Sequence, residues 1–178
     1  MKRSLLALAL IIFLIFVGGK RVVAQTEDTA YIRVVTERAG KIVATLGLPD
    51  SAKFYQVRTM VADQYRDLNA MSQRKDTNLT RLHSAYLGRL ATVLSPQQVE
   101  KVKDGMTYGV LEVTYRAYCE KLPALTDEQK TYILTCLTEA REHAMDGGSS
   151  KEKHAWFGKY KGRINNYLSS QGYDLKKN

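Results

Sequence analysis

Apolar residues recur at helical spacing along nearly the whole chain, and this periodicity limits the fold more than any other feature. Apolar stripes run over residues 32–46, 54–71 and 79–93, and Gly47 closes the first of them. The polar stretch 72–78 separates the second stripe from the third. The pattern therefore predicts an all-α fold that begins with three helices.

Two later helix starts carry the same capping signal. Ser95 and Gln98 form one capping box, and Thr126 and Gln129 form the other. In each, the hydroxyl accepts from the backbone amide three residues on, and the Gln side chain accepts from the backbone amide of the hydroxyl residue. Each cap is worth about 1 kcal/mol. We expect helices to begin directly after Ser95 and Thr126.

The remaining helices are bounded by glycines. Residues 104–110 contain Gly105 and Gly109 and predict a bent connection into a helix around 113–121. The helix that starts after Thr126 ends at 147–148, and a last helix runs from the serines at 149–150 to about residue 171. We predict a single-domain bundle of five or six helices.

The N-terminus has the order of a secretory signal peptide. Basic residues at 2–3 precede an apolar run over 5–17, and Ala24 supplies the small residue before a cut. The run is shorter than the roughly 20 residues of a membrane-spanning helix. The basic pair at 20–21 lies between the run and the cut, which leaves an uncleaved N-terminal anchor as the alternative. We therefore divide the chain into a signal peptide, 1–24, and a helical domain, 25–178.

Removal of that segment also changes the charge. It takes away four basic residues and no acid, so the formal charge of +9 falls to about +5. A modest positive charge on an exported helical domain favours solubility or an acidic glycan over nucleic acid. We expect no nucleic-acid partner and no stable membrane insertion after signal removal.

The two cysteines, Cys119 and Cys136, could form a disulfide in an oxidising compartment. If their helices fold back on each other, the two residues lie at levels about 9 Å apart. A disulfide tolerates only about 7 Å between Cα atoms. We predict two separate thiols and leave the bridged form open.

The last helix has one apolar and one small-residue face. Opposite the apolar stripe lie Gly158 and Gly162, each of which costs about 1 kcal/mol relative to Ala inside a helix. A close approach by another backbone or by a ligand would compensate this cost. The apolar stripe comprises Trp156, Phe157, Tyr160, Ile164, Tyr167 and Leu168.

Aromatic rings on this helix suggest a sugar site, because sugars present C–H faces to aromatic rings and hydroxyls to polar side chains. The alternative is that the rings are core residues, as their shared stripe indicates. Candidate ligand-binding residues combine one ring with the polar edge of the helix and two residues outside it: His154, Trp156, Lys159, Arg163, Asn166, Arg141 and Tyr108.

A charged cluster near residue 142 has three interpretations. Glu139 and His143, one turn apart, could share a metal. Glu139, Glu142 and Asp146 could supply paired carboxylates for glycoside hydrolysis. Charges at helical spacing more often form a salt-bridged, solvated face. We assign no catalytic residue, no metal ligand and no cofactor.

The C-terminal half contains three distinctive segments: LSPQQVEKVKDGMTYGVLEVTYRAY, LTDEQKTYI and EAREHAMDGGSSKEKHAWFGKYKGRINNYLSSQGYDLKK. Through these segments the chain resembles a known family, domain of unknown function 3826. The resemblance implies an exported, helical protein of glycan-degrading Gram-negative bacteria, and the family description suggests sugar binding. It supplies no motif of functional residues. A weaker resemblance, through the Leu-Thr-x-x-Gln pattern at Leu125, is to small periplasmic stress chaperones.

Three hypotheses for the function follow, in order of preference. The first is a non-catalytic, periplasmic or secreted protein that binds an oligosaccharide, including an acidic one. The second is a periplasmic chaperone or adaptor that binds a protein partner. The third is a glycan-active enzyme that works through Glu139, Glu142 or Asp146.

Overall fold

The computed structural model describes residues 29–74 and 78–175, and within these ranges it contains helices and connections but no strand. The predicted all-α class is confirmed. The signal peptide predicted over residues 1–24 lies outside the described residues. The helices span residues 29–44, α2 Ser51–Arg74, α3 Leu79–Ala91, α4 Pro96–Met106, α5 Val110–Lys121, α6 Asp127–Met145 and α7 Ser150–Ser170.

The described residues thus hold seven helices, so five or six was an undercount. The connection between α4 and α5 lies where the bend was predicted. Tyr108 and Gly109 both adopt left-handed backbone angles, with φ of 60° and 65°. The amide of Gly109 donates to the carbonyl of Asp104 at 2.8 Å, which closes the end of α4. The predicted bend is confirmed, and it separates two short helices.

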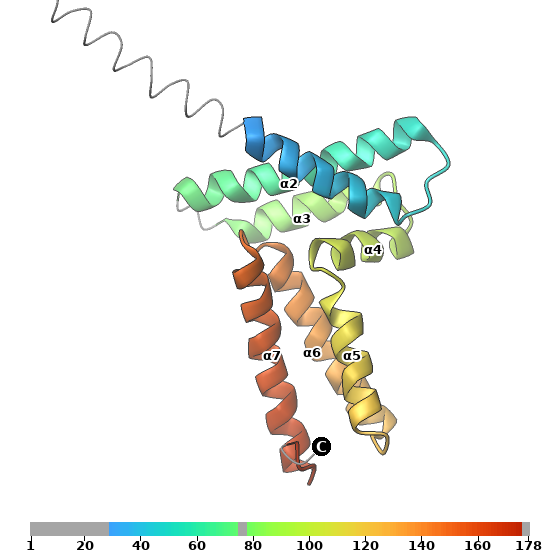
Figure 1. Cartoon of the computed structure of the whole chain (residues 1–178), viewed down its shortest axis with the longest axis vertical. Helices are drawn as coiled ribbons and strands as arrows, with labels where there is room; N and C mark the ends of the chain where they lie inside the picture. Colours follow the sequence, from blue (N-terminus) through green and yellow to red (C-terminus); the bar gives the residue numbers. More distant parts are fainter. Residues whose placement is uncertain (1–28, 75–77, 176–178) are drawn as a thin grey trace, which may run out of the picture.

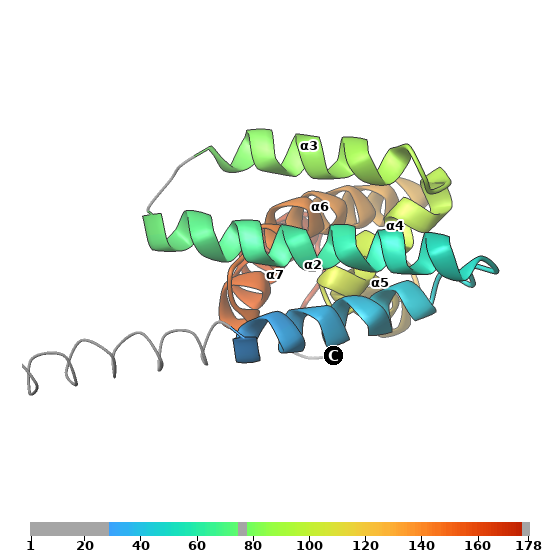
Figure 2. The same ribbon diagram turned by 90° about the horizontal axis from the view of Figure 1, so that it is seen from above.

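The helices pack in two groups, each with its own hydrophobic core (Figure 1). Helix 29–44, α2, α3 and α4 form a layer, and α5, α6 and α7 form a stem that projects from it. Seen from above, helix 29–44, α2 and α3 lie side by side across the top of the stem (Figure 2). Met145, at the end of α6, belongs to the core of the layer and so connects the two groups.

Both predicted capping boxes are present, with Ser95 before α4 and Thr126 before α6. The apolar faces also follow the prediction with small departures. In the first stripe, Ile32 is 36% exposed, whereas the residues that follow it are buried, namely Val35, Ala39, Ile42 and Leu46. On α7, Trp156 and Tyr167 are only half-buried, at the margin of the core. The fully buried α7 residues are Phe157, Tyr160, Ile164 and Leu168.

The glycines of α7 do not mark a close approach by another backbone among the described residues, so that part of the expectation was wrong. A Cβ added at Gly158 or Gly162 would meet nothing within 4 Å, because this face of α7 is open to solvent. The close approach occurs at Gly105 in α4, where an added Cβ would lie 2.8 Å from Cγ2 of Ile42. Only a residue without a side chain allows helix 29–44 and α4 to pack this closely.

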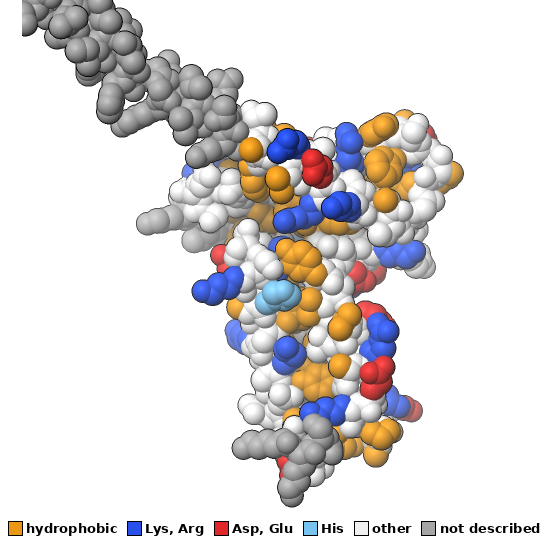
Figure 3. All heavy atoms as spheres, viewed as in Figure 1, with side chains coloured by type: hydrophobic (Ala, Val, Ile, Leu, Met, Phe, Trp, Pro, Cys, Tyr) orange, Lys and Arg blue, Asp and Glu red, His pale blue; other side chains and the backbone are white. Residues whose placement is uncertain are grey.

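Both cysteines are free, as predicted. Cys136 is buried in the core of the stem, and Cys119 is half-buried on α5. None of the described helices is long and apolar enough to cross a membrane. On the face shown in Figure 3, Lys and Arg side chains are spread over both layer and stem and are interspersed with apolar side chains.

Candidate functional site

A pocket of about 780 Å³ opens where the start of α3, the end of α6 and the first half of α7 meet. Its wall combines apolar, aromatic and charged side chains. Thr80 and His83 come from α3, Glu142 and Asp146 come from the end of α6, and Trp156 and Lys159 come from α7. The pocket therefore lies at the junction between the layer and the stem.

Hydrogen bonds at the N-terminus of α7 fix the residue at which this helix begins. Ser149 Oγ accepts from the amide of Glu152 at 3.2 Å. The carboxylate of Glu152 in turn accepts from the amide of Gly148 at 2.9 Å. These bonds satisfy donors that the first turn of a helix leaves free. They define where α7 begins and hence the position of Trp156 less than two turns later.

The indole of Trp156 is half-buried and has two neighbours. His143 stacks on it with ring centroids 4.4 Å apart and an interplanar angle of 17°. The ammonium of Lys159 lies 4.9 Å from the ring centroid, within the range of a cation–π contact. Because Lys159 is exposed, its side chain can leave the ring at little cost.

His83 forms the opposite wall and is held by two carboxylates of α6. Its Nδ1 lies 3.0 Å from Asp146 Oδ2, and its Nε2 lies 3.4 Å from Glu142 Oε2. The hydrogen bonds to Asp146 and Glu142 outweigh burial and raise the pKa of His83 to about 9. At neutral pH this imidazole is therefore a cation that ties α3 to α6.

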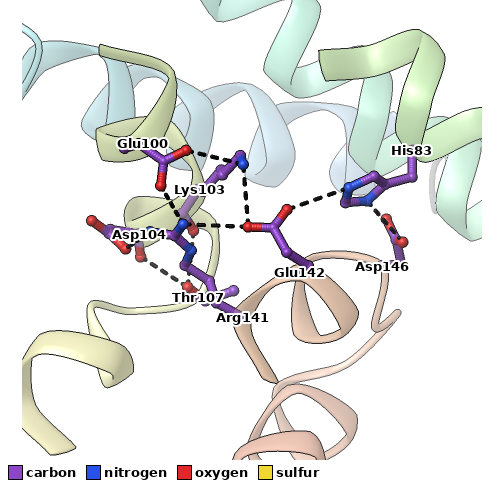
Figure 4. Close-up of polar contacts among 8 residues, drawn as sticks. All are labelled: His83, Glu100, Lys103, Asp104, Thr107, Arg141, Glu142 and Asp146. Carbon is purple, nitrogen blue, oxygen red and sulfur yellow. Dashed lines mark hydrogen bonds and ion pairs between the residues drawn. The ribbon is translucent and has the colours of Figure 1, made fainter. Parts of the chain in front are cut away.

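Glu142 continues the ionic contacts toward α4 (Figure 4). Its Oε1 accepts from Lys103 at 3.2 Å and from Arg141 at 3.3 Å. Burial alone would raise the pKa of Glu142, but its contacts with His83, Lys103 and Arg141 lower that pKa to about 2. Glu142 is thus an anion throughout the physiological range.

Arg141 lies at the α4 end of the same network. Its guanidinium is buried, donates to Asp104 Oδ1 at 2.7 Å, and forms an ion pair with Glu100. We call the set of His83, Glu100, Lys103, Asp104, Arg141, Glu142 and Asp146 the junction network. It connects α3 and α4 of the layer to α6 of the stem.

The structure brings together only part of the predicted ligand-binding set. Trp156 and Lys159 line the pocket. Arg141 does not reach it, because its guanidinium is enclosed by carboxylates of the junction network. Tyr108 and His154 lie side by side with ring centroids 5.8 Å apart, and neither lines this pocket.

The two remaining predicted residues lie further along α7. Arg163 pairs with Glu139 at 3.1 Å and covers the ring of Tyr160 at 4.5 Å. Asn166 is exposed and does not line the pocket. The polar edge of α7 is therefore not a single site in this structure.

Sequence reasoning missed His83 and Thr80, which lie on a helix far from α7 in the chain. His83 and Asp146 are 63 residues apart. One signal was available, since Glu142 and Asp146 are one helical turn apart and present two carboxylates to the same neighbour. That spacing indicates a cationic partner but does not identify it.

The charged cluster of α6 is an ion-pair network between helices rather than a solvated face. Among the described residues, no group of three or more His, Cys, Asp or Glu is arranged to hold a metal ion. A glycosidase acid needs a raised pKa, whereas that of Glu142 is lowered to about 2. Glu139 pairs with Arg163 outside the pocket. Glu142 and Glu139 therefore do not fit the role of the acid in glycoside hydrolysis.

Comparison with protein families gives a match to one family model, described as a protein of unknown function (DUF3826), over residues 32–80 and 71–178. No match to a curated protein was found. The two matched segments together cover most of the chain, including every helix that lines the pocket. The chain therefore belongs to the DUF3826 family.

Proposed function

We propose that this chain is an exported, non-catalytic protein that binds an oligosaccharide in the pocket beside Trp156. The observation that carries this proposal is a half-buried indole in a pocket whose other walls present carboxylates. Sugar rings stack their C–H faces on indole, and their hydroxyls donate to carboxylate oxygens. At about 780 Å³, the pocket has the size of typical small-ligand sites.

The two side chains that contact the indole of Trp156 determine which face of the ring a sugar can occupy. His143 covers one face of the ring, so a sugar takes the other face and Lys159 moves aside. The displaced ammonium can then donate to a ring or hydroxyl oxygen of the same sugar. Glu142 and Asp146 are held in place by His83, which keeps the acceptor groups preorganised.

Calorimetric titration of the protein with a panel of neutral and acidic oligosaccharides tests the proposal. We expect a saturable signal that Trp156→Leu weakens about five- to tenfold, since a stacked aromatic ring contributes about 1–1.5 kcal/mol. The matched control is Tyr167→Leu, which removes another half-buried ring of α7 that lies outside the pocket. Equal weakening by both variants would contradict a site at Trp156. No signal from the folded protein across the panel would favour the second hypothesis, a protein partner.

Export is the second part of the proposal and rests on the order of residues 1–24. Mass spectrometry of the protein recovered from the cell envelope and medium after expression of the full chain tests it. The expected N-terminal residue is Gln25. Recovery of the uncut chain from membranes would instead support the retained N-terminal anchor.

A further inference from the structure

A second, more enclosed cavity of about 220 Å³ lies between helix 29–44, α2 and the turn that joins α6 to α7. The residues of interest in its lining are Arg38, Tyr65, Tyr108, Gly148, Ser149 and Lys153. No Asp or Glu is among the described residues that line it. Its two cationic side chains are Lys153, which is buried, and Arg38, which is exposed. The lining itself supplies no acidic partner, and Asp146 and Glu152 attract Lys153 from outside it.

Lys153 is the most buried charged residue among those described, at 2% exposure. Its ammonium donates to the carbonyls of Ala144 and Met145, each at 3.0 Å, and so uses two of its three N–H donors. Burial lowers the pKa of Lys153 to about 8, which leaves most of it protonated at neutral pH. The ammonium hydrogen-bonds only to carbonyls, while Asp146 and Glu152 attract it through space. Its third N–H donor suits an additional anionic partner.

A second cation, Arg38, lies near the same aromatic ring as Lys153, that of Tyr65. The guanidinium of Arg38 lies 5.4 Å from the centroid of the Tyr65 ring, and the ammonium of Lys153 lies 5.9 Å from it. The two like charges repel, and Arg38 contributes to the lowered pKa of Lys153. An anion between them would replace this repulsion with two attractions.

Neutral donors complete the surroundings. Burial raises the pKa of Tyr65 to about 12, so its hydroxyl keeps its proton at physiological pH. Tyr108 and Ser149 border the same cavity and each brings a hydroxyl, whereas the amide of Gly148 already donates to Glu152. These groups add to the two cations and would not form a site alone.

We infer that this cavity binds an oxyanion, namely the carboxylate or sulfate group of an acidic sugar. The link to a sugar rests on the proposed function and on the closeness of the two spaces, since Gly147 lines both this cavity and the Trp156 pocket. The neutral rings then occupy the larger pocket, and the acidic group occupies the smaller one.

Two probes separate the anion site from the sugar site. Inorganic sulfate and free glucuronate are titrated into the ¹⁵N-labelled protein at constant ionic strength with chloride as the balancing salt. We expect saturable shifts of the amide signals of residues 147–150. Arg38→Gln should weaken sulfate binding about tenfold, as loss of one charged contact does. The matched control is Arg33→Gln, which removes the same charge from an exposed position of the same helix outside the cavity.

Tyr108→Phe gives an independent check, because it retains the ring and should weaken sulfate binding severalfold. Equal sulfate affinity in the Arg38 and Arg33 variants, or the absence of saturable shifts, would overturn the inference and leave Lys153 as a structural tie between α7 and α6. Sulfate binding that is retained in the Trp156→Leu variant supports the anion site even if no oligosaccharide gives a calorimetric signal. In that event the proposed function fails while the anion site stands.

Discussion

The junction network predicts a specific pH dependence of stability, carried by His83. Replacement of His83 by Gln removes the cation between Glu142 and Asp146. The pKa of His83 is raised from 6.5 to about 9 in the folded protein. A group with a raised pKa stabilises the fold fully below its unfolded pKa, and this contribution is lost as the pH rises through the folded pKa.

The magnitude follows from the shift. One pKa unit corresponds to about 1.4 kcal/mol, so a change from 6.5 to about 9 gives an upper bound of about 3.5 kcal/mol. The side chains of His83, Glu142 and Asp146 are 18%, 29% and 16% exposed, so solvent screens part of this interaction. We expect the His83→Gln variant to be about 1.5 kcal/mol less stable than the wild type at pH 6. The difference should approach zero near pH 10.

Urea unfolding of wild type and variant between pH 6 and pH 10 measures this difference. The matched control is His154→Gln, which makes the same substitution at an exposed histidine of α7 outside the junction network. A difference between wild type and His83→Gln that stays constant over this range would refute the assignment of a charged His83. Added salt should reduce the effect at pH 6, because the pairs are partly exposed.

Other predictions concern single positions and are measured by the same unfolding assay. Gly158→Ala and Gly162→Ala should each stabilise the protein by up to about 1 kcal/mol, since an added Cβ meets nothing within 4 Å on the open face of α7. A loss of stability there would indicate an unseen contact on that face. Gly105→Ala should destabilise the protein, because the new Cβ would lie 2.8 Å from the side chain of Ile42. Arg141→Met should cost about 2–3 kcal/mol by removing the buried cation that joins α6 to the carboxylates of α4, and an unchanged midpoint would refute that role.

Local signals in the sequence predicted much of the helical structure. Both capping boxes formed where a hydroxyl residue precedes a Gln by three positions, because the four residues contain both partners. Gly47 ends the first helix with a φ of 62°, and Gly172 follows the last helix with a φ of 92°. Such features depend on neighbouring residues and are therefore readable from a single chain.

The candidate site was less predictable because it depends on contacts between distant helices. Arg141 was interpreted as a ligand-binding residue, but Glu100 and Asp104 of α4 surround it. His83 had no local signal that connects it with α6. The periodicity also did not predict two separate cores, because a helix shows one apolar face whichever core it packs against. The structure gives no packing reason for the two glycines of α7.

The most direct test of the proposed sugar site uses the fluorescence of Trp156, the only tryptophan in the chain. Titration with the oligosaccharides that give a calorimetric signal should shift its emission and protect it from quenching by acrylamide, with a midpoint equal to the calorimetric dissociation constant. Calorimetric binding without any change in emission or quenching would contradict a site that includes the indole of Trp156.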